Sequence, residues 1–110
     1  MNIPIISDEK KVEALIYARS VRKKRSDIKK GLKSKVISLN ELLDDKNEYH
    51  IVFMDMKIMD ILMSLPNFGV MRSRKTLQKL QISHRKKFNG LGNKQKLRIF
   101  DYFRKLQLIS

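Results

Sequence analysis

The 110-residue sequence has no cysteine and no tryptophan, and only two histidines, two prolines and four glycines. Without cysteine it can form no disulfide, thiolate nucleophile or cysteine-ligated zinc site. His50 and His84 are too far apart for a paired-histidine metal motif, and a phosphate-loop signature and a Ser/His/Asp arrangement are both missing. We therefore expect no metal, no other cofactor and no enzymatic activity.

Long apolar segments are also missing from the sequence. No apolar run approaches the length of a membrane span. The first residues lack the basic start and the apolar stretch of a signal peptide. Leu, Ile, Val and Phe nevertheless make up 35 of the 110 residues, which is enough for a packed core. We therefore expect one domain over residues 1–110, in the cytoplasm and without a membrane partner.

Positive charge dominates what is present, with 25 Lys and Arg against 11 Asp and Glu and a formal net charge of +14. Self-repulsion of this size disfavours a compact state unless a polyanion screens it. The charge is concentrated in residues 19–35, which hold nine bases and one acid, and in residues 62–110, which hold twelve bases and one acid. Nucleic acid is the expected polyanion, and an anionic membrane surface is the less favoured alternative because residues 22–30 have few bulky apolar side chains.

The apolar residues recur at helical spacing, so the sequence predicts an all-α fold. We expect a long basic N-terminal helix over residues 8–35, followed by a helical bundle over residues 38–106. Within the bundle, Ser38–Glu41 is a capping-box pattern, Pro66 ends a helix, and Asn93 is the expected N-cap of the last helix. The expected inward faces of the helices at 70–80 and 93–106 are Val70, Ser73, Leu77 and Leu80, and Leu97, Phe100, Phe103 and Leu106.

The turn between the helices ending near Leu65 and beginning near Val70 is the first candidate site. We expect Gly69 to adopt a positive φ and the first amides of the following helix to remain free for a phosphate oxygen. Basic residues then follow along an exposed stripe. The alternative is an ordinary helical hairpin with a solvated basic face. The predicted DNA-binding residues here are Asn67, Phe68, Gly69, Val70, Arg72, Arg74, Lys75 and Lys79.

A second candidate segment begins at His84, where four adjacent donors precede a glycine turn. We expect Phe88 and Leu91 to anchor it in the core, and Asn89 to bond a phosphate or a base edge. Its predicted DNA-binding residues are Arg85, Lys86, Lys87, Asn89, Gly90, Gly92, Asn93 and Lys94. The N-terminal helix is expected to form a separate second DNA face through Arg19, Arg22, Lys23, Arg25, Lys29 and Lys30.

Three motifs together resemble the mycobacterial-type integration host factor family of actinobacteria. They are Leu65-Pro66-x-x-Gly69 with Arg72, Leu80-x-Ile82, and Arg85-Lys86-Lys87-x-x-Gly90-Leu91-Gly92-x-x-Gln95. The resemblance implies an all-helical domain with a helix–two-turns–helix element of the ribosomal protein S13-like type. It further implies a nucleoid-associated protein that binds duplex DNA with little sequence preference, bends or compacts it, and assists a recombinase in phage integration and other site-specific recombination.

The sequence departs from that family's pattern at three positions. Asn67 and Val70 stand where the family often has Lys, and Asn89 stands where it has the last Arg of an Arg-Arg-x-Arg motif. RNA or the ribosome is the alternative partner, since the same helical element also serves RNA-binding proteins. A third alternative, a remnant of a base-excision enzyme, is disfavoured. Some glycosylases carry this element beside a catalytic domain that the sequence does not contain, and Pro4 is not an N-terminal nucleophile unless the chain is trimmed.

Overall fold

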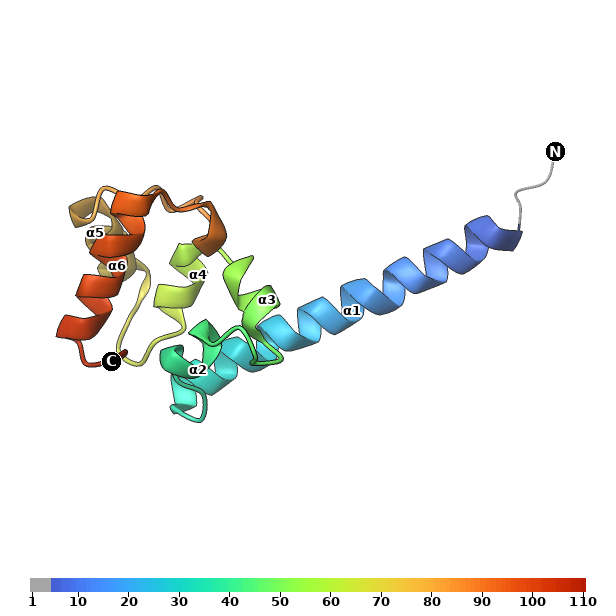
Figure 1. Ribbon diagram of the computed structural model, residues 1–110, viewed down its shortest axis with the longest axis horizontal. Helices are drawn as coiled ribbons and strands as arrows, with labels where there is room; N and C mark the ends of the chain where they lie inside the picture. The colour runs from blue at the N-terminus through green and yellow to red at the C-terminus, as the bar shows by residue number, and fades with distance from the viewer. Residues whose placement is uncertain (1–4) are drawn as a thin grey trace.

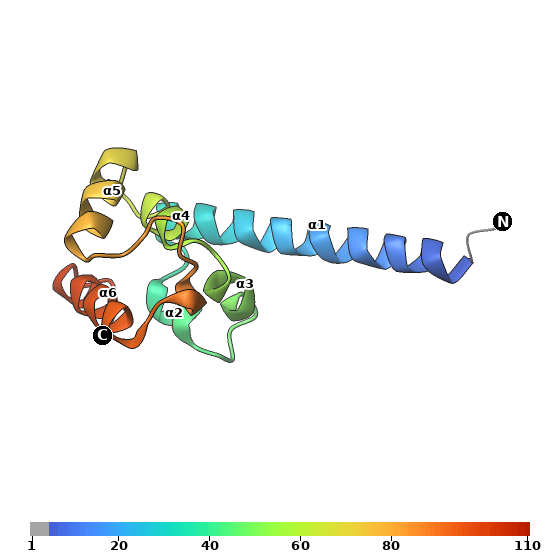
Figure 2. The same ribbon diagram turned by 90° about the horizontal axis from the view of Figure 1, so that it is seen from above.

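One long helix leads into a cluster of short helices (Figure 1). The structure, a computed structural model, describes the backbone of residues 5–110 and the side chains of residues 9–110; Pro4 lies outside the described residues. Helix α1 spans Ile5–Ser34, three residues before the predicted start and close to the predicted end. Its first half extends away from the other helices, which gives the molecule extents of 59 × 28 × 25 Å (Figure 2).

The remaining helices form the predicted bundle. They are α2 (Leu39–Leu43), α3 (His50–Met54), α4 (Ile58–Met63), α5 (Val70–Lys79), the short 3₁₀ helix η1 (Phe88–Gly90) and α6 (Asn93–Lys105). An isolated antiparallel bridge between Lys57 and Lys87 joins two connecting segments. The all-α prediction is confirmed. None of the helices within residues 5–110 combines the length and the apolar character that crossing a bilayer requires.

Helix α2 begins at the predicted capping box. The Glu41 amide donates to the Ser38 hydroxyl, which itself donates to the Glu41 carboxylate, both over 3.1 Å. The helix ends at Leu43, and the Asp44 carboxylate then accepts the Lys46 amide and closes a turn. His50 ties α3 to α2, since its Nδ1 lies 2.8 Å from the Leu42 carbonyl oxygen.

Glycine is unfavourable inside a helix, and its presence at position 31 is explained by the way the chain folds back over the end of α1. Lys35 adopts a left-handed φ of 64°, and the Ile37 amide then bonds the Gly31 carbonyl over 3.1 Å. The Ile37 side chain lies over Gly31, where an added Cβ would be 2.5 Å from its Cδ1. A larger residue at position 31 would therefore displace Ile37 from the core edge.

The core lies between the bundle end of α1 and the five α-helices that follow. Ile28 and Leu32 of α1, four residues apart on one side of the helix, are buried. A row of aromatic rings fills the centre, with Phe88 lying 5.3 Å from Phe53 and 5.9 Å from Phe100 between ring centroids. This row connects α3, η1 and α6 and fixes the segment between α5 and α6 against the bundle.

Two of the predicted inward positions are wrong. Val70 is 45% exposed and Leu97 is 67% exposed. Val70 is the first residue of α5, and Leu97 lies on the opposite side of α6 from the buried Ile99 and Phe103. The buried positions are Ser73, Thr76 and Leu77 of α5, and Ile99 and Phe103 of α6.

Candidate nucleic-acid interface

The turn between α4 and α5 is organised around Phe68 and Arg72. The Phe68 ring is buried, and its amide donates to the Leu65 carbonyl over 3.2 Å. The Arg72 guanidinium stacks on this ring, 3.9 Å from its centroid, and Arg72 Nη1 donates to the Asn67 carbonyl oxygen over 3.2 Å. Phe68 is therefore a support for Arg72, and its amide is not among those free for a phosphate.

The left-handed residue of this turn is Asn67 and not Gly69, which corrects the sequence-based expectation. Asn67 has a φ of 66°, whereas Gly69 has a φ of −101° and a ψ of −175°. A side chain at Gly69 would meet no atom within 4 Å. Gly69 is the N-cap of α5, and no side chain of residues 9–110 caps this end. The missing side chain thus leaves the first turn of α5 open to solvent, where helix amides favour an anion.

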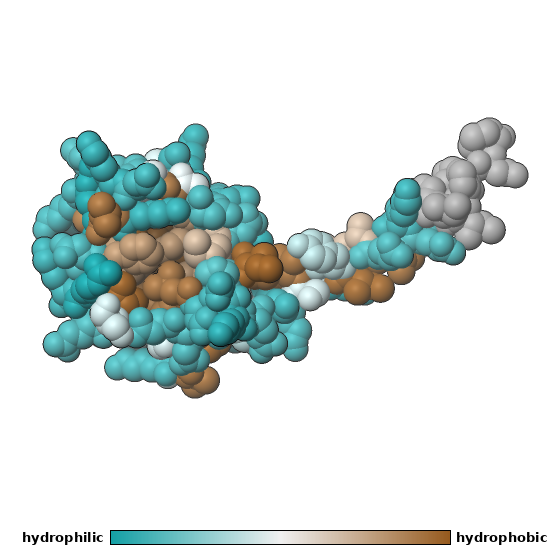
Figure 3. Space-filling view, in the orientation of Figure 1, coloured by the Kyte–Doolittle hydropathy of each residue, from teal (hydrophilic) through white to brown (hydrophobic). Residues whose placement is uncertain are grey.

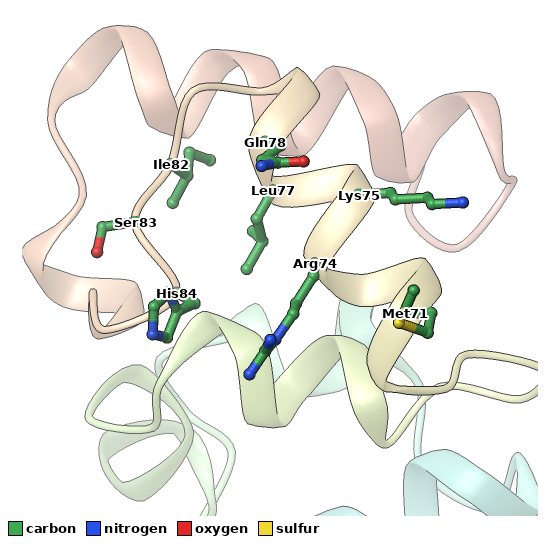
Figure 4. A pocket seen from close by; sticks show the side chains of 8 residues that line it. All are labelled: Met71, Arg74, Lys75, Leu77, Gln78, Ile82, Ser83 and His84. Carbon is green, nitrogen blue, oxygen red and sulfur yellow. The ribbon is translucent and has the colours of Figure 1, made fainter.

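The outer face of α5 carries the predicted cations. Arg72, Arg74, Lys75 and Lys79 are all exposed. Met71 and Lys75 form a ridge between two open hollows of about 580 and about 570 Å³. Figure 4 shows the first hollow, with Leu77 and Ile82 between α5 and the segment that follows it, and with Arg74 and His84 at one rim. The outer face of α5 and the start of the second basic segment therefore share one surface.

The chain after α5 turns sharply without a glycine. Gln81 adopts a left-handed φ of 58°, the Gln81 amide bonds the Gln78 carbonyl, and the Ile82 amide bonds the Leu77 carbonyl over 2.9 Å. This is the Schellman arrangement that satisfies the last carbonyls of a helix. It buries Ile82 and directs residues 83–87 across the bundle toward α3, where they run over its top in Figure 1.

Backbone bonds hold the second basic segment in place. The Ile58 amide donates to the Lys86 carbonyl and the Phe88 amide donates to the Met56 carbonyl, each over 2.9 Å. Phe88 and Leu91 are buried, which confirms their predicted role as anchors. The residues around these anchors face solvent: Arg85, Lys86, Lys87 and Asn89 are exposed, as are Gly90, Gly92, Asn93 and Lys94. The charges are thus presented by a fixed scaffold.

One cation of this segment has an internal partner that the sequence did not indicate. Lys87 Nζ lies 3.2 Å from Asp55 Oδ1, and both side chains are about half exposed, at 53% and 52%. Exposed pairs of this kind contribute little, typically below about 1 kcal/mol. Asp55 is therefore a weak competitor of any anion that approaches Lys87.

The start of α6 differs from the predicted start by one residue. Gly92, and not Asn93, is the N-cap, and its amide donates to Gln95 Oε1 over 3.1 Å. Gln95 Nε2 reaches the Gln81 carbonyl over 3.1 Å, and Arg98 Nη1 reaches the Leu80 carbonyl over 2.9 Å. Sequence reasoning missed these two side chains, although their role is structural: they clamp the start of α6 to the end of α5.

The basic residues of α1 divide into two groups. Arg19, Arg22, Lys23, Lys29 and Lys30 are exposed, whereas Arg25 is half-buried. Arg25 lines the same small hollow as Asp55 and Asn89, together with Tyr17, Val21 and two residues of α3. At this point the two expected basic faces are neighbours, because α3 packs against both α1 and η1.

In the part of the chain that the structure describes, no arrangement of side chains supports a metal site. Within these residues no three His, Asp or Glu side chains gather where they could hold a metal ion. The site consists of cations, amides and shallow hollows on helical and loop surfaces. Such an arrangement can bind an extended anion across several elements.

The family model and the known proteins that match this chain agree with one another. Residues 32–103 match the family model of the S13-like H2TH domain. The integration host factor of Streptomyces coelicolor is 32% identical over 95 residues, which cover 86% of this chain and 88% of that protein. The integration host factors of Mycolicibacterium smegmatis and Mycobacterium tuberculosis are each 29% identical over 103 residues, covering 94% of this chain and 97% of each relative.

A solved structure of sIHF bound to an 8-bp palindromic DNA has a similar fold. Its TM-score is 0.67 at 31% sequence identity, and the match covers 79% of this chain and 97% of that chain. The names of these proteins and of the matched domain denote no enzyme, in agreement with the sequence-based prediction.

Proposed function

The chain belongs to the actinobacterial integration host factor family with an S13-like H2TH domain, and from this membership we propose that it is an architectural protein that binds duplex DNA. The similar solved structure, sIHF, is bound to DNA. The resemblance in the sequence led to the same family.

The observation that carries the proposal is a continuous band of cations across three segments. The first hollow connects the outer face of α5 to His84, and the small hollow beside α3 connects Asn89 to Arg25 of α1. Between these two points the chain presents Arg85, Lys86 and Lys87 to solvent. A duplex is a polyanion with a charge about every 1.7 Å of its axis, so a band of this kind matches its backbone better than it matches a small ligand.

The band contacts phosphates and not bases in this proposal. Its donors are lysine and arginine side chains together with the open amides at the start of α5. Contacts of these types position a protein on the duplex and carry little sequence information. Asn67 and Asn89 are amide side chains on this surface, and they are candidates for a base contact. We therefore expect low sequence specificity.

The exposed cations of α1 extend the contact beyond the bundle. We propose that Arg19, Arg22, Lys23, Lys29 and Lys30 form a second contact region for DNA. A duplex that touches both the bundle and a projecting helix must follow the angle between them, and this would bend or compact it. The inferred place of action is the nucleoid, and the inferred process is site-specific recombination, in which bent DNA is presented to a recombinase.

A matched pair of quadruple variants tests the surface. Replacing Arg72, Lys75, Lys86 and Lys87 by Ala removes four proposed phosphate contacts, and at about 0.1 M salt four contacts correspond to roughly a 4,000-fold loss of affinity. The control replaces Lys10, Lys11, Lys33 and Lys46, four exposed cations outside the bundle part of the band. Gel-shift titration with a short duplex should show less than about tenfold loss for this control. Equal losses in the two variants would contradict the proposed surface.

Competition separates DNA from RNA. The labelled short duplex is displaced by unlabelled duplex DNA or by structured RNA of the same length, at one salt concentration. We expect DNA to compete better. If RNA competes as well or better, the RNA-binding alternative replaces the proposed function.

A further inference from the structure

The free half of α1 carries apolar side chains on a surface that no other part of the described chain covers. Val12 is 55% exposed, Leu15 is 52% exposed and Ile16 is 61% exposed. They lie on the far side of the helix from Ile28 and Leu32, which face the bundle. Figure 3 shows brown side chains along α1 outside the bundle, where most of the surface around them is hydrophilic. Apolar side chains grouped in this way on a projecting helix indicate a contact surface.

Charges are ordered along the same face. Glu9, Ile16 and Lys23 follow each other at seven-residue spacing, which keeps them on one side of a helix. This line therefore has an acid at one end, an apolar residue in the middle and a base at the other end. Next to it, Val12 and Leu15 lead to Arg19 and Arg22 at the same spacing. Within residues 9–110 the structure has the ion pairs Lys87–Asp55 and Lys105–Asp101, and neither involves a charged residue of this face.

We propose that this face of α1 pairs with the same face of a second copy of the chain, with the two helices antiparallel. An antiparallel arrangement centred on Ile16 sets Glu9 of each copy against Lys23 of the other, with Val12 and Leu15 packed beside the centre. A parallel arrangement would instead set acid against acid and base against base. Charge order therefore selects both the partner and its direction.

Other occupants fit this face less well. Glu9 lies on the face itself and would repel a DNA phosphate or an anionic lipid there, whereas Lys10 and Lys11 only balance Glu9 and Glu13 in net charge. The apolar side chains at its centre cannot form ion pairs or hydrogen bonds with a polyanion. DNA is suited to the basic stretch nearer the bundle, where Arg25, Lys29 and Lys30 stay available in the paired state.

The pair is weak in the free protein. Glu9 to Lys23 spans about 21 Å of helix at 1.5 Å per residue, a contact smaller than the standard protein interface of about 1,600 Å². The net charge of +14 on each copy also opposes association. Bound DNA neutralises this charge and concentrates the copies, so it strengthens the pair; this effect on pairing rests on the proposed function.

The absence of cysteine from the sequence allows a direct test by cross-linking. Ile16→Cys places a thiol at the centre of the proposed contact, where two copies bring their Cα atoms within disulfide range. The control is Val36→Cys, which is 76% exposed and lies in the connection after α1. At sub-millimolar protein without DNA, mild oxidation should link Ile16→Cys chains at least about fivefold faster than Val36→Cys chains. Equal rates would overturn the proposal.

Charge exchange in the Ile16→Cys chain tests the direction of the helices. Glu9→Lys should slow cross-linking, and Glu9→Lys combined with Lys23→Glu should restore it, since acid again faces base between antiparallel copies. No restoration would overturn the antiparallel arrangement. Circular dichroism checks that each variant keeps its helix content. Because this assay contains no DNA, its failure leaves the DNA-binding proposal untouched, and a failure of DNA binding leaves the pairing untouched.

Discussion

Asp55 is the acid that lies against the cationic band, and its removal should strengthen DNA binding. Its carboxylate holds Lys87 Nζ at 3.2 Å, and it lines the hollow that Arg25 and Asn89 share. In the proposed complex a phosphate has to displace this carboxylate from Lys87. Asp55→Asn keeps the size of the side chain, removes its charge and frees the lysine.

The size of the effect follows from the exposure of the pair. Both side chains are about half exposed, so the ion pair contributes less than about 1 kcal/mol and its loss leaves the fold stable. One additional phosphate contact contributes about 0.9 to the salt slope, which corresponds to roughly eightfold in affinity at 0.1 M salt. Because Lys87 is only partly engaged by Asp55, we expect a gain of about three- to eightfold.

The assay is titration of a fluorescent short duplex by anisotropy at about 0.1 M salt. The matched control is Asp101→Asn, which removes the same charge from an exposed ion pair with Lys105 on α6, 3.3 Å between Nζ and Oδ2. The control should gain less than about twofold. Equal gains in the two variants would mean that net charge alone sets the affinity. An unchanged or lower affinity of Asp55→Asn would refute the proposed position of the band beside Lys87.

Three further substitutions test the scaffold of the site. Gly31→Ala should lower the free energy of unfolding by about 1–2 kcal/mol in urea, because the added Cβ meets the Ile37 side chain at 2.5 Å and this outweighs the better helix propensity; greater stability would contradict it. Gly69→Val should leave stability within about 1 kcal/mol of the parent, since its φ is negative and its surroundings are open, but should weaken short-duplex binding by covering the first amides of α5. Normal DNA binding by Gly69→Val would show that those amides contact no phosphate. Phe88→Ala should cost about 3–5 kcal/mol by removing the ring between Phe53 and Phe100, and the melting temperature should fall accordingly; a small shift would mean that the 85–89 segment is held by its backbone bonds alone.

The helices were predictable because their apolar spacing and their end signals agree. Ser38 and Glu41 form the predicted cap, and Pro66 follows the end of α4. Burial was harder to predict, since apolar spacing does not show which side of a helix its neighbours cover. Val70 is exposed at the first residue of α5, and Leu97 is exposed because the buried side of α6 is that of Ile99 and Phe103.

Glycine was an unreliable guide to the turns. Lys35, Asn67, Gln81 and Gln107 hold the left-handed conformations, and in the described chain no glycine does. At Gln81 and Gln107 the fold supplies enough hydrogen bonds and apolar contact to offset the cost of a side chain at positive φ. Sequence alone could not show this compensation, because it depends on residues such as Ile82 packing after the turn.

The basic segments of the site could be recognised in the sequence, because they are rich in Lys and Arg and nearly free of Asp and Glu. Their positions relative to one another could not be predicted. Residues 19–35 and 83–92 are far apart in the chain, and α3 brings Arg25 and Asn89 together. The contact of Lys87 with Asp55 depends on the bridge between Lys57 and Lys87, which no local pattern indicates. Long-range packing of this kind turned two predicted faces into neighbours.

The dependence of duplex affinity on salt decides whether the protein grips the DNA backbone. Seven cations form the bundle part of the band, namely Arg72, Arg74, Lys75, Lys79, Arg85, Lys86 and Lys87. If they neutralise about six to eight phosphates with the help of their neighbours, the logarithm of the binding constant should fall against the logarithm of salt concentration with a slope of about −5 to −7. Scrambling the duplex sequence should change the affinity by only a few fold at each salt concentration. A slope shallower than about −2 would contradict backbone binding by this surface.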